Sequence, residues 1–295
     1  MRLSRFERRK TLPKTIDTLV DDIYAMFGED HFPHDPQEFV RFGKNVEELF
    51  HDRFNVVRGK PTLRMSNIGR PDRQLWYDIN GKHEKEKLLP NTLIKFAYGD
   101  LIEQMILLYA KMAGHTVEQE QAEVELDGIK GHIDAVIDGV LVDVKSASSF
   151  SFDKFESGAL FLPGNDPFGY VAQLAGYIEA VNPGGRGGFL AVDKTLGKLC
   201  FCEIPRHVLD QYRVRDRIAH IKEVVASEVI PPRCYEDVPD GKSGNMKLST
   251  GCSYCSHKFN CWDNLKTYYY SNGPRYLSKV VREPKVSTKE EAWEV

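Results

Sequence analysis

The chain has 295 residues, 41% of them hydrophobic, and a formal net charge of -3 at pH 7. That length and apolar content are enough to bury a sizeable core. The near-neutral charge excludes binding to nucleic acid through overall basicity, so such binding would need local basic patches. No apolar run is long enough to span a bilayer, and the N-terminus lacks the hydrophobic segment of a signal peptide. We therefore expect an intracellular, cytoplasmic protein without membrane contact.

The first part of the chain is expected to be helical. Apolar residues recur at helical spacing in Thr15 to Phe27 and in Pro36 to Arg53, so we assign residues 1–64 to a helical N-terminal region. The basic stretch Met1 to Lys10 is interpreted as a solvated tail rather than as an arm lying along phosphates. The charged segment Lys82 to Lys87 is expected to be a loop.

Residues 65–230 are expected to form the main domain. It opens with a turn signal at Asn67 to Pro71, followed by a segment with aromatic and arginine residues in which Arg70 and Arg73 contact phosphate or pack against the rings. A helix is predicted from Asn91 to Ala113, and Gly114 ends it. Its expected apolar stripe consists of Leu93, Ala97, Leu101, Met105, Leu108 and Met112.

A β-hairpin is the most informative element. Apolar residues alternate before and after Asp138-Gly139, a dipeptide typical of a two-residue hairpin turn. Asp143 and Lys145 lie two apart on the second strand and so share one side of it, while Asp134 belongs to the first strand. By spacing alone this is a solvated face or a magnesium site, because buried carboxylates need a partner and a hard cation suits them.

The remaining elements of the main domain follow from the same periodicities. Ser146 to Asp166 is expected to be irregular, and its aromatic residues cover the core or stack on bases. Beyond it we predict helices at Phe168 to Val181 and His207 to Val229, with strands at Gly187 to Val192 and Lys198 to Ile204 between them. Arg213, Arg215 and Arg217 would give the last helix a modest basic face.

Four short motifs follow in order: G-D-L-I-E ending at Glu103, G-H-I-D ending at Asp134, D-V-K from Asp143 to Lys145, and Q-L-A-G-Y from Gln173 to Tyr177. This succession resembles the PD-(D/E)xK nuclease superfamily, and within it the RecB-like nucleases that include CRISPR-adaptation nucleases and phage exonucleases. The resemblance implies an α/β fold with a restriction-endonuclease-like core, in which helices flank a central mixed β-sheet.

The resemblance also implies roles for individual residues. Asp134, Asp143 and the Val144 carbonyl would bind Mg²⁺ or Mn²⁺, with Glu103 as a further ligand. Lys145 would orient the nucleophile or neutralise developing charge. Gln173 and Tyr177 would lie on a helix beside the cleft and contact DNA or hold the lysine. RecB-like relatives often have histidine where this chain has Glu103, but glutamate keeps an oxygen ligand that suits a hard cation.

The C-terminal residues 231–295 contain Cys252, Cys255 and Cys261 in a C-x2-C-x5-C arrangement, and seventeen residues separate Cys234 from Cys252. Four thiolates suit zinc or an iron-sulfur cluster. The ending resembles the iron-sulfur staple of several RecB-like families, which favours a [4Fe-4S] cluster over Zn²⁺. In those families the fourth cysteine commonly precedes the core, whereas here no cysteine comes before Cys200. We rank Cys234 first as the fourth ligand; Cys200, Cys202 or, in a zinc site, His257 are the alternatives.

Together these features predict a metal-dependent deoxyribonuclease, an exonuclease acting in recombination, repair or phage DNA metabolism. The expected partners are single-stranded DNA or duplex ends, with a recombination or replication protein as a further partner; the gene could be carried by a phage. A structure-specific endonuclease of the same fold and a non-catalytic, metal-stapled DNA-binding module are the alternatives.

Overall fold

The computed structural model describes residues 14–28, 35–55, 60–81, 90–271 and 273–286. The expected basic tail and the charged loop at Lys82 to Lys87 lie outside the described residues. No helix among the residues described is long and apolar enough to cross a membrane.

The chain forms two compact units, each assembled from separate stretches. The first comprises Met1–Arg58, Pro90–Asn165 and Leu174–Tyr212, and the second comprises Gly59–Leu89, Asp166–Gln173 and Arg213–Val295. The division into regions 1–64, 65–230 and 231–295 stays a prediction.

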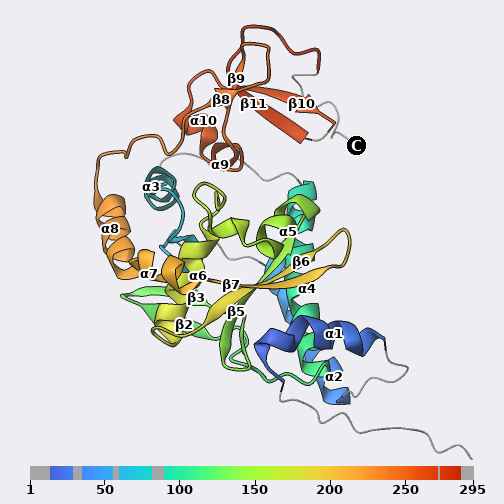
Figure 1. Ribbon diagram of the computed structural model, residues 1–295. Coiled ribbons are helices and arrows are strands. Elements are labelled where there is room, and N and C mark those ends of the chain that lie inside the picture. The colour runs from blue at the N-terminus through green and yellow to red at the C-terminus, as the bar shows by residue number, and fades with distance from the viewer. Residues whose placement is uncertain (1–13, 29–34, 56–59, 82–89, 272, 287–295) are drawn as a thin grey trace, which may run out of the picture. The chain divides into compact units, whose positions relative to one another are not determined.

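The first unit is a mixed sheet flanked by helices, so the expected fold class is confirmed (Figure 1). The strand order is β1-β4-β5-β6-β7, and only β5 and β6 run parallel. The strands are β1 (Val117–Glu118), β4 (Ala135–Ile137), β5 (Val140–Ala147), β6 (Gly187–Asp193) and β7 (Leu199–Glu203), and β2 (Glu123–Leu126) pairs with β3 (Ile129–His132) in a separate ribbon.

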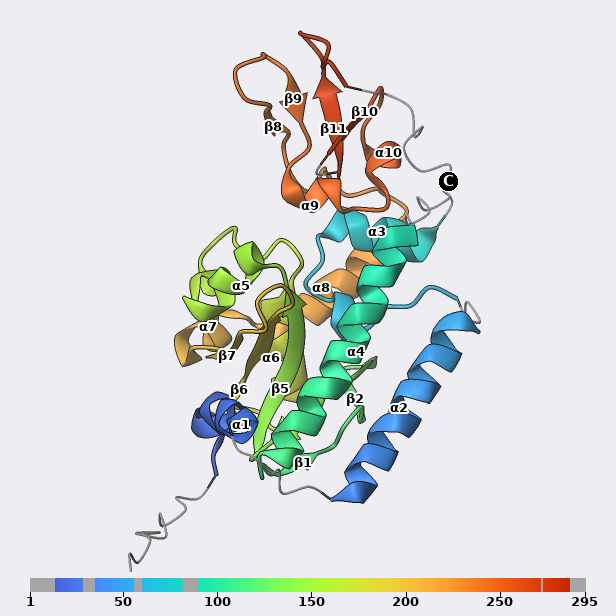
Figure 2. The same ribbon diagram turned by 90° about the vertical axis from the view of Figure 1, so that its right-hand side faces the viewer.

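The helices of the first unit follow the predicted ones closely at the N-terminal end. They are α1 (Leu19–Phe27), preceded by a 3₁₀ turn at Ile16–Thr18, α2 (Pro36–Phe54), α4 (Pro90–Met112), α5 (Ser149–Glu156) and α7 (Arg206–Gln211). Helix α6 (Tyr170–Val181) begins in the second unit and continues in the first. Helices α2 and α4 lie side by side (Figure 2).

The predicted hairpin is formed by β4 and β5. Its turn residues Asp138 and Gly139 both have positive φ, 50° and 79°, as a tight two-residue hairpin turn requires. Val142 and Val144 of β5 belong to the core of the first unit, together with residues of α1 and α4. Asp143 and Lys145 therefore lie on the opposite side of the strand.

The predicted apolar stripe of α4 was right only in part, because Leu108 is buried but other stripe positions are not. Leu93 is 48% exposed, whereas Ile106, Leu107 and Ala110 are buried and join the core. Helix α4 is apolar nearly all round, so periodicity alone did not distinguish its buried side from the others.

Two further predictions need correction. Ser146 to Asp166 is not irregular throughout, because it contains α5 and a 3₁₀ turn at Ala159–Phe161; Phe152 and Phe155 are buried three residues apart and fix α5 on the core, while Phe150 is exposed. The predicted helix from His207 to Val229 is two helices, α7 and α8 (Val214–Ala226).

The break between α7 and α8 has a physical reason. Val208 in α7 and Ile218 and Ile221 in α8 are all buried, but a continuous helix would turn Val208 away from the other two. Tyr212 and Arg213 leave the helical conformation, with ψ of 81° and 74°, and the boundary between the two compact units falls between them.

The second unit combines helices α3 (Asp72–Asn80) and α8 with an antiparallel sheet (Figure 1). The Nε1–H of Trp76 donates to the Ser227 carbonyl at 2.7 Å and so joins α3 to the end of α8. The sheet has the order β10-β11-β9-β8. Its strands are β8 (Val238–Pro239), β9 (Met246–Lys247), β10 (Lys266–Tyr270) and β11 (Gly273–Lys279), with short helices α9 (Thr250–Ser253) and α10 (Lys258–Cys261) between β9 and β10 and a 3₁₀ turn at Met65–Asn67 before α3.

The expected basic face of α8 is reduced by internal pairing. Arg217 Nη1 lies 2.5 Å from Asp72 Oδ1, and its other guanidinium nitrogens donate to the carbonyls of Ile68 and Arg70. Arg217 therefore ties α8 to the segment before α3 instead of facing phosphates. Arg213 and Arg215 are exposed.

A backbone contact between Gly69 and Gly169 fixes two segments of the second unit together. A Cβ at Gly69 would lie 2.3 Å from the Gly169 carbonyl oxygen. Gly69→Ala should therefore destabilise the protein by about 1–3 kcal/mol, because backbone atoms must move to admit the methyl group. Gly43→Ala, on an open helical site of α2, should instead stabilise it by about 0.5–1 kcal/mol.

Chemical denaturation of both variants checks this prediction. A Gly69→Ala protein as stable as the parent would show that the close contact between the two glycines is not a constraint on the fold.

Candidate active site

Asp143 and Lys145 come together on β5. Asp143 is only 3% exposed, and Lys145 Nζ lies 2.5 Å from its Oδ2. The sequence pattern left a solvated face as an alternative, and the burial of Asp143 rules that alternative out. An ammonium group is needed here because a buried carboxylate without a partner is strongly unfavourable.

Asp134, the residue directly before β4, lies beside this pair. Its Oδ2 accepts a hydrogen bond of 2.7 Å from the Val144 N–H, so the carboxylate is held against the strand that carries Asp143 and Lys145. The hairpin register places Ala135 opposite Val142, which brings the two acids to the same end of the hairpin.

Glu103 approaches the acids from α4. It is half-buried rather than on the surface, and the side-chain amide of Gln121 donates to its Oε1 at 2.6 Å. Gln121 adopts a positive φ of 54° in the turn before β2. Sequence reasoning missed Gln121, because no motif or periodicity links it to a helix eighteen residues earlier.

The three acids interact electrostatically. Burial raises the pKa of Glu103, and the negative charges of Asp134 and Asp143 raise it further, while Lys145 opposes them. Burial also raises the pKa of Asp134, and the negative charge of Asp143 has a second, smaller effect in the same direction. One lysine thus faces more negative charge than it can balance, and a divalent cation would remove the repulsion.

The chemistry of these donors fits Mg²⁺ or Mn²⁺, which prefer carboxylate oxygens. As the side chains stand, no three His, Cys, Asp or Glu residues in the described ranges converge on a single metal-binding point. Binding a cation would therefore draw Asp143 away from Lys145 and towards Glu103 and Asp134. The roles of these residues and of the Val144 carbonyl as ligands stay predictions.

Gln173 and Tyr177 both lie on α6, four residues apart and so on one side of the helix. Tyr177 is 3% exposed and belongs to the first unit, whereas Gln173 is half-buried and belongs to the second. Their expected contacts with DNA or lysine stay predictions.

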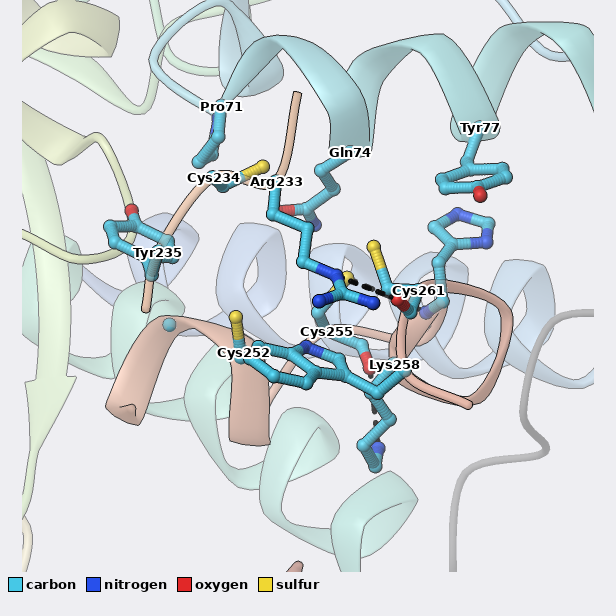
Figure 3. Close-up of a pocket in the computed structure, with 13 residues that line it drawn as sticks. Pro71, Gln74, Tyr77, Arg233, Cys234, Tyr235, Cys252, Cys255, Lys258 and Cys261 are labelled. Atoms are coloured by element: carbon cyan, nitrogen blue, oxygen red, sulfur yellow. Dashed lines mark hydrogen bonds between the residues drawn. The ribbon is translucent and has the colours of Figure 1, made fainter. Parts of the chain in front are cut away.

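The four cysteines that sequence analysis grouped together line one small cavity in the second unit (Figure 3). They come from three places: Cys234 after α8, Cys252 and Cys255 around α9, and Cys261 at the end of α10. Burial, together with the charges of Cys261, Cys252 and Cys234, raises the pKa of Cys255 to about 11. The four thiols are thus close enough to interact electrostatically.

Two arginines lie among these thiols: Arg73, for which the sequence left phosphate contact and ring packing open, and Arg233, which the sequence did not single out. Arg73 Nε donates to Cys261 Sγ at 3.0 Å. The Arg233 guanidinium lies 4.4 Å from the Trp262 ring centre, and its Nε donates to the Cys261 carbonyl; Figure 3 shows it between the cysteines. Arg73 thus packs within the second unit instead of contacting phosphate.

The donor set fits a thiolate-bound metal, since four cysteines with cationic neighbours favour a cluster of negative net charge. The cavity measures about 20 Å³, so the thiols would have to turn inward and Arg233 outward to form a ligand sphere. His257 lines the same cavity. Its Nε2 lies 3.1 Å from Asp78 Oδ1, and its buried Nδ1 makes no hydrogen bond within the described part of the chain, so the zinc alternative with His257 remains open.

Cys200 and Cys202 lie on β7, in the first unit. Cys202 is buried and pairs with Phe189 across the sheet, while Cys200 pairs with Ala191. Burial raises the pKa of Cys202 to about 11. Cys200 and Cys202 therefore pack within the sheet of the first unit.

This chain is distantly similar to two solved structures. No family model and no curated protein matches it. The crystal structure of SSO0001 is 16% identical, covers 76% of this chain and 95% of that chain, and has a TM-score of 0.35. A phage related exonuclease from Haemophilus somnus 129PT is 16% identical, covers 58% of this chain and 95% of that chain, and has a TM-score of 0.37. Likenesses of this strength carry no argument about activity.

The raised carboxyl pKa values predict a pH-dependent stability. Without divalent cations, the folded protein holds protons on Glu103 (pKa about 8) and Asp134 (pKa about 7) that the unfolded chain releases near pH 4. The contribution of these two groups to the free energy of unfolding should therefore be most favourable below about pH 4. It should decrease as the pH rises from about 4 towards 8. Glu103→Gln should flatten this decrease, whereas Glu118→Gln, at an exposed site on β1, should not.

Thermal unfolding in chelator across this pH range measures the effect. Adding Mg²⁺ at pH 8 should restore stability, by about 2.7 kcal/mol at a hundredfold excess over its Kd. A parent protein whose pH profile matches that of Glu103→Gln would contradict the electrostatic coupling.

Proposed function

We propose that the protein is a Mg²⁺- or Mn²⁺-dependent deoxyribonuclease that removes nucleotides from DNA ends. The observation that carries this proposal is the group formed by Glu103, Asp134, Asp143 and Lys145, in which Asp143 is buried and paired with the Lys145 ammonium group while Glu103 and Asp134 have raised pKa values. Such an arrangement is suited to binding a hard cation next to a phosphate.

A divalent cation, when bound, lowers the pKa of water and screens the charge of the attacked phosphate. The carboxylates of Asp134 and Asp143 would hold the cation, and the Val144 N–H fixes the orientation of Asp134. With Asp143 bound to a cation, Lys145 would be free of its 2.5 Å contact with Asp143 and would hold the nucleophile or neutralise charge that develops on the phosphate. Gln121 keeps Glu103 facing the other two acids.

One experiment distinguishes the proposed exonuclease from the two alternatives, an endonuclease of the same fold and a non-catalytic DNA-binding module. End-labelled linear DNA and closed circular DNA are incubated with the protein in Mg²⁺ or in chelator. Loss of label from linear DNA alone supports an exonuclease. Opening of the circle assigns an endonuclease, and binding without cleavage in Mg²⁺ assigns the non-catalytic module.

Substitutions on β5 test the chemistry directly. Asp143→Ala or Lys145→Ala should lower the cleavage rate about a hundredfold or more while DNA affinity is largely kept, because interactions specific to the transition state are removed. Asp153→Ala and Lys130→Ala, at an exposed position of α5 and an exposed ion pair of the β2-β3 ribbon, are the matched controls. Near-normal cleavage by a folded Asp143→Ala protein would contradict the proposed site.

We further propose that Cys234, Cys252, Cys255 and Cys261 bind a [4Fe-4S] cluster that ties the C-terminal segment down. The support is that all four line one cavity beside Arg73 and Arg233. Ligand bonds between segments far apart in sequence would stabilise this part of the second unit.

Protein purified without oxygen should be brown and contain about four irons per chain, as thiolate-bound iron predicts. Cys255→Ala should lose the metal and be cut more readily by protease after Pro232, whereas Cys202→Ala should keep the metal. Colourless protein with one zinc per chain would show that the site binds zinc instead of a cluster. Metal-free protein with the same proteolysis pattern would contradict a metal staple altogether.

A further inference from the structure

Three aromatic rings form a cluster on the surface of the second unit. The ring centre of Phe168 lies 5.5 Å from that of Tyr170 and 5.6 Å from that of Tyr254. Phe168 is 41% exposed, Tyr254 is 74% exposed and Tyr170 is half-buried. Such a group of solvent-facing rings, here called the aromatic platform, is unusual unless something binds to it.

Ordered backbone holds the aromatic platform from both sides. The Asp166 carboxylate accepts hydrogen bonds from the first N–H groups of α6, at 3.0 Å for Tyr170. Tyr254 lies between Cys252 and Cys255, in the turn that follows α9, where consecutive backbone hydrogen bonds define the chain path. Because these segments are already ordered, a ligand that stacks on the rings loses little affinity to their immobilisation.

We infer that the aromatic platform binds single-stranded DNA by stacking on its bases. The inference rests on the proposed nuclease function and names the form of DNA that the second unit takes. Ring faces stack on any base, which gives affinity without sequence preference. Bases within a duplex are already stacked on each other, so the aromatic platform favours a strand whose bases are unpaired.

The residues around the aromatic platform agree with a DNA strand better than with a protein partner. Ser249 to Ser253, which precede Tyr254, are small or polar except for Cys252, whereas the centre of a protein interface is usually rich in larger apolar groups. Gly69 touches Gly169, between Phe168 and Tyr170. Gly69 is followed by Arg70, whose side chain is 42% exposed but whose Nη1 is already paired with Asp78 Oδ2 at 3.1 Å, so the affinity of this surface comes from base stacking rather than from phosphate contacts.

The motif residue Gln173 extends the same surface. It lies three residues after Tyr170 on α6, so both project from one side of the helix. The aromatic platform thus lies at the start of the helix that carries Gln173, which is half-buried.

Binding measured without cleavage tests this inference. Fluorescence anisotropy with a labelled single-stranded oligonucleotide in chelator should show about tenfold weaker binding for Phe168→Ala and for Tyr254→Ala. Phe168→Tyr and Tyr254→Phe keep a ring and should bind like the parent. Phe259→Ala is the matched control, because Phe259 is 46% exposed in the same unit but packs on Tyr276 instead.

Abasic nucleotides identify stacking specifically. A strand that lacks one base at the right position should bind the parent about tenfold more weakly, while Tyr254→Ala should no longer distinguish it from the intact strand. Unchanged affinity in both alanine variants would overturn the inference, as would losses that the ring-retaining variants share. Equal losses for a blunt duplex would overturn the preference for single strands.

The outcomes separate this inference from the proposed function. If the parent cleaves DNA but the alanine variants bind single strands normally, the aromatic platform is not the binding surface. If stacking is found but the parent never cleaves DNA, the inference about binding stands and the proposed activity does not. A protein partner that binds the parent and not Tyr254→Ala, with DNA affinity unchanged, would assign the aromatic platform to that partner and overturn the inference.

Discussion

The proposed chemistry depends on the burial of like charges between β5 and the helix α4. Asp143 is almost fully buried, and Glu103 and Asp134 have raised pKa values because of burial and mutual repulsion. A single lysine at 2.5 Å from Asp143 balances only part of this charge. Folding thus brings together carboxyl groups whose ionisation lowers the stability, and a bound cation would offset that cost.

In the cysteine cavity, groups that ionise to negative charge lie beside positively charged side chains. There, thiols whose ionisation burial disfavours lie beside Arg73 and Arg233. These guanidinium groups favour thiolates, and hence a bound metal, over neutral thiols. Bonds from a shared metal to Cys234 and the other cysteines would tie together separate segments of the second unit.

A division of labour between the two units follows from these features. The acids and Lys145 belong to the first unit, and the cysteine cavity and the aromatic platform belong to the second. Helix α6 contains residues of both, with Gln173 in one and Tyr177 in the other. In the proposed function the first unit hydrolyses the phosphodiester bond and the second holds the strand.

The sequence by itself determined the elements whose signals are local. Asp138-Gly139 specified the β4-β5 hairpin, and alternation placed Asp143 and Lys145 on one side of β5. The four cysteines ranked first by their spacing line one cavity, while their role as metal ligands stays a prediction. These features depend on residues close together in the chain, where turn geometry and the period of the strand leave few alternatives.

Only the tertiary structure decided what depends on contacts between distant residues. The buried side of α4, the break between α7 and α8 and the pairing of Arg217 with Asp72 all differ from the sequence-based expectation. An apolar helix or an arginine-rich one fits several environments, and the choice between them is made by the residues that pack against it. The hydrogen bond between Gln121 and Glu103 and the ring contact between Phe168 and Tyr254 join residues that are far apart in the sequence, and no local pattern predicts either contact.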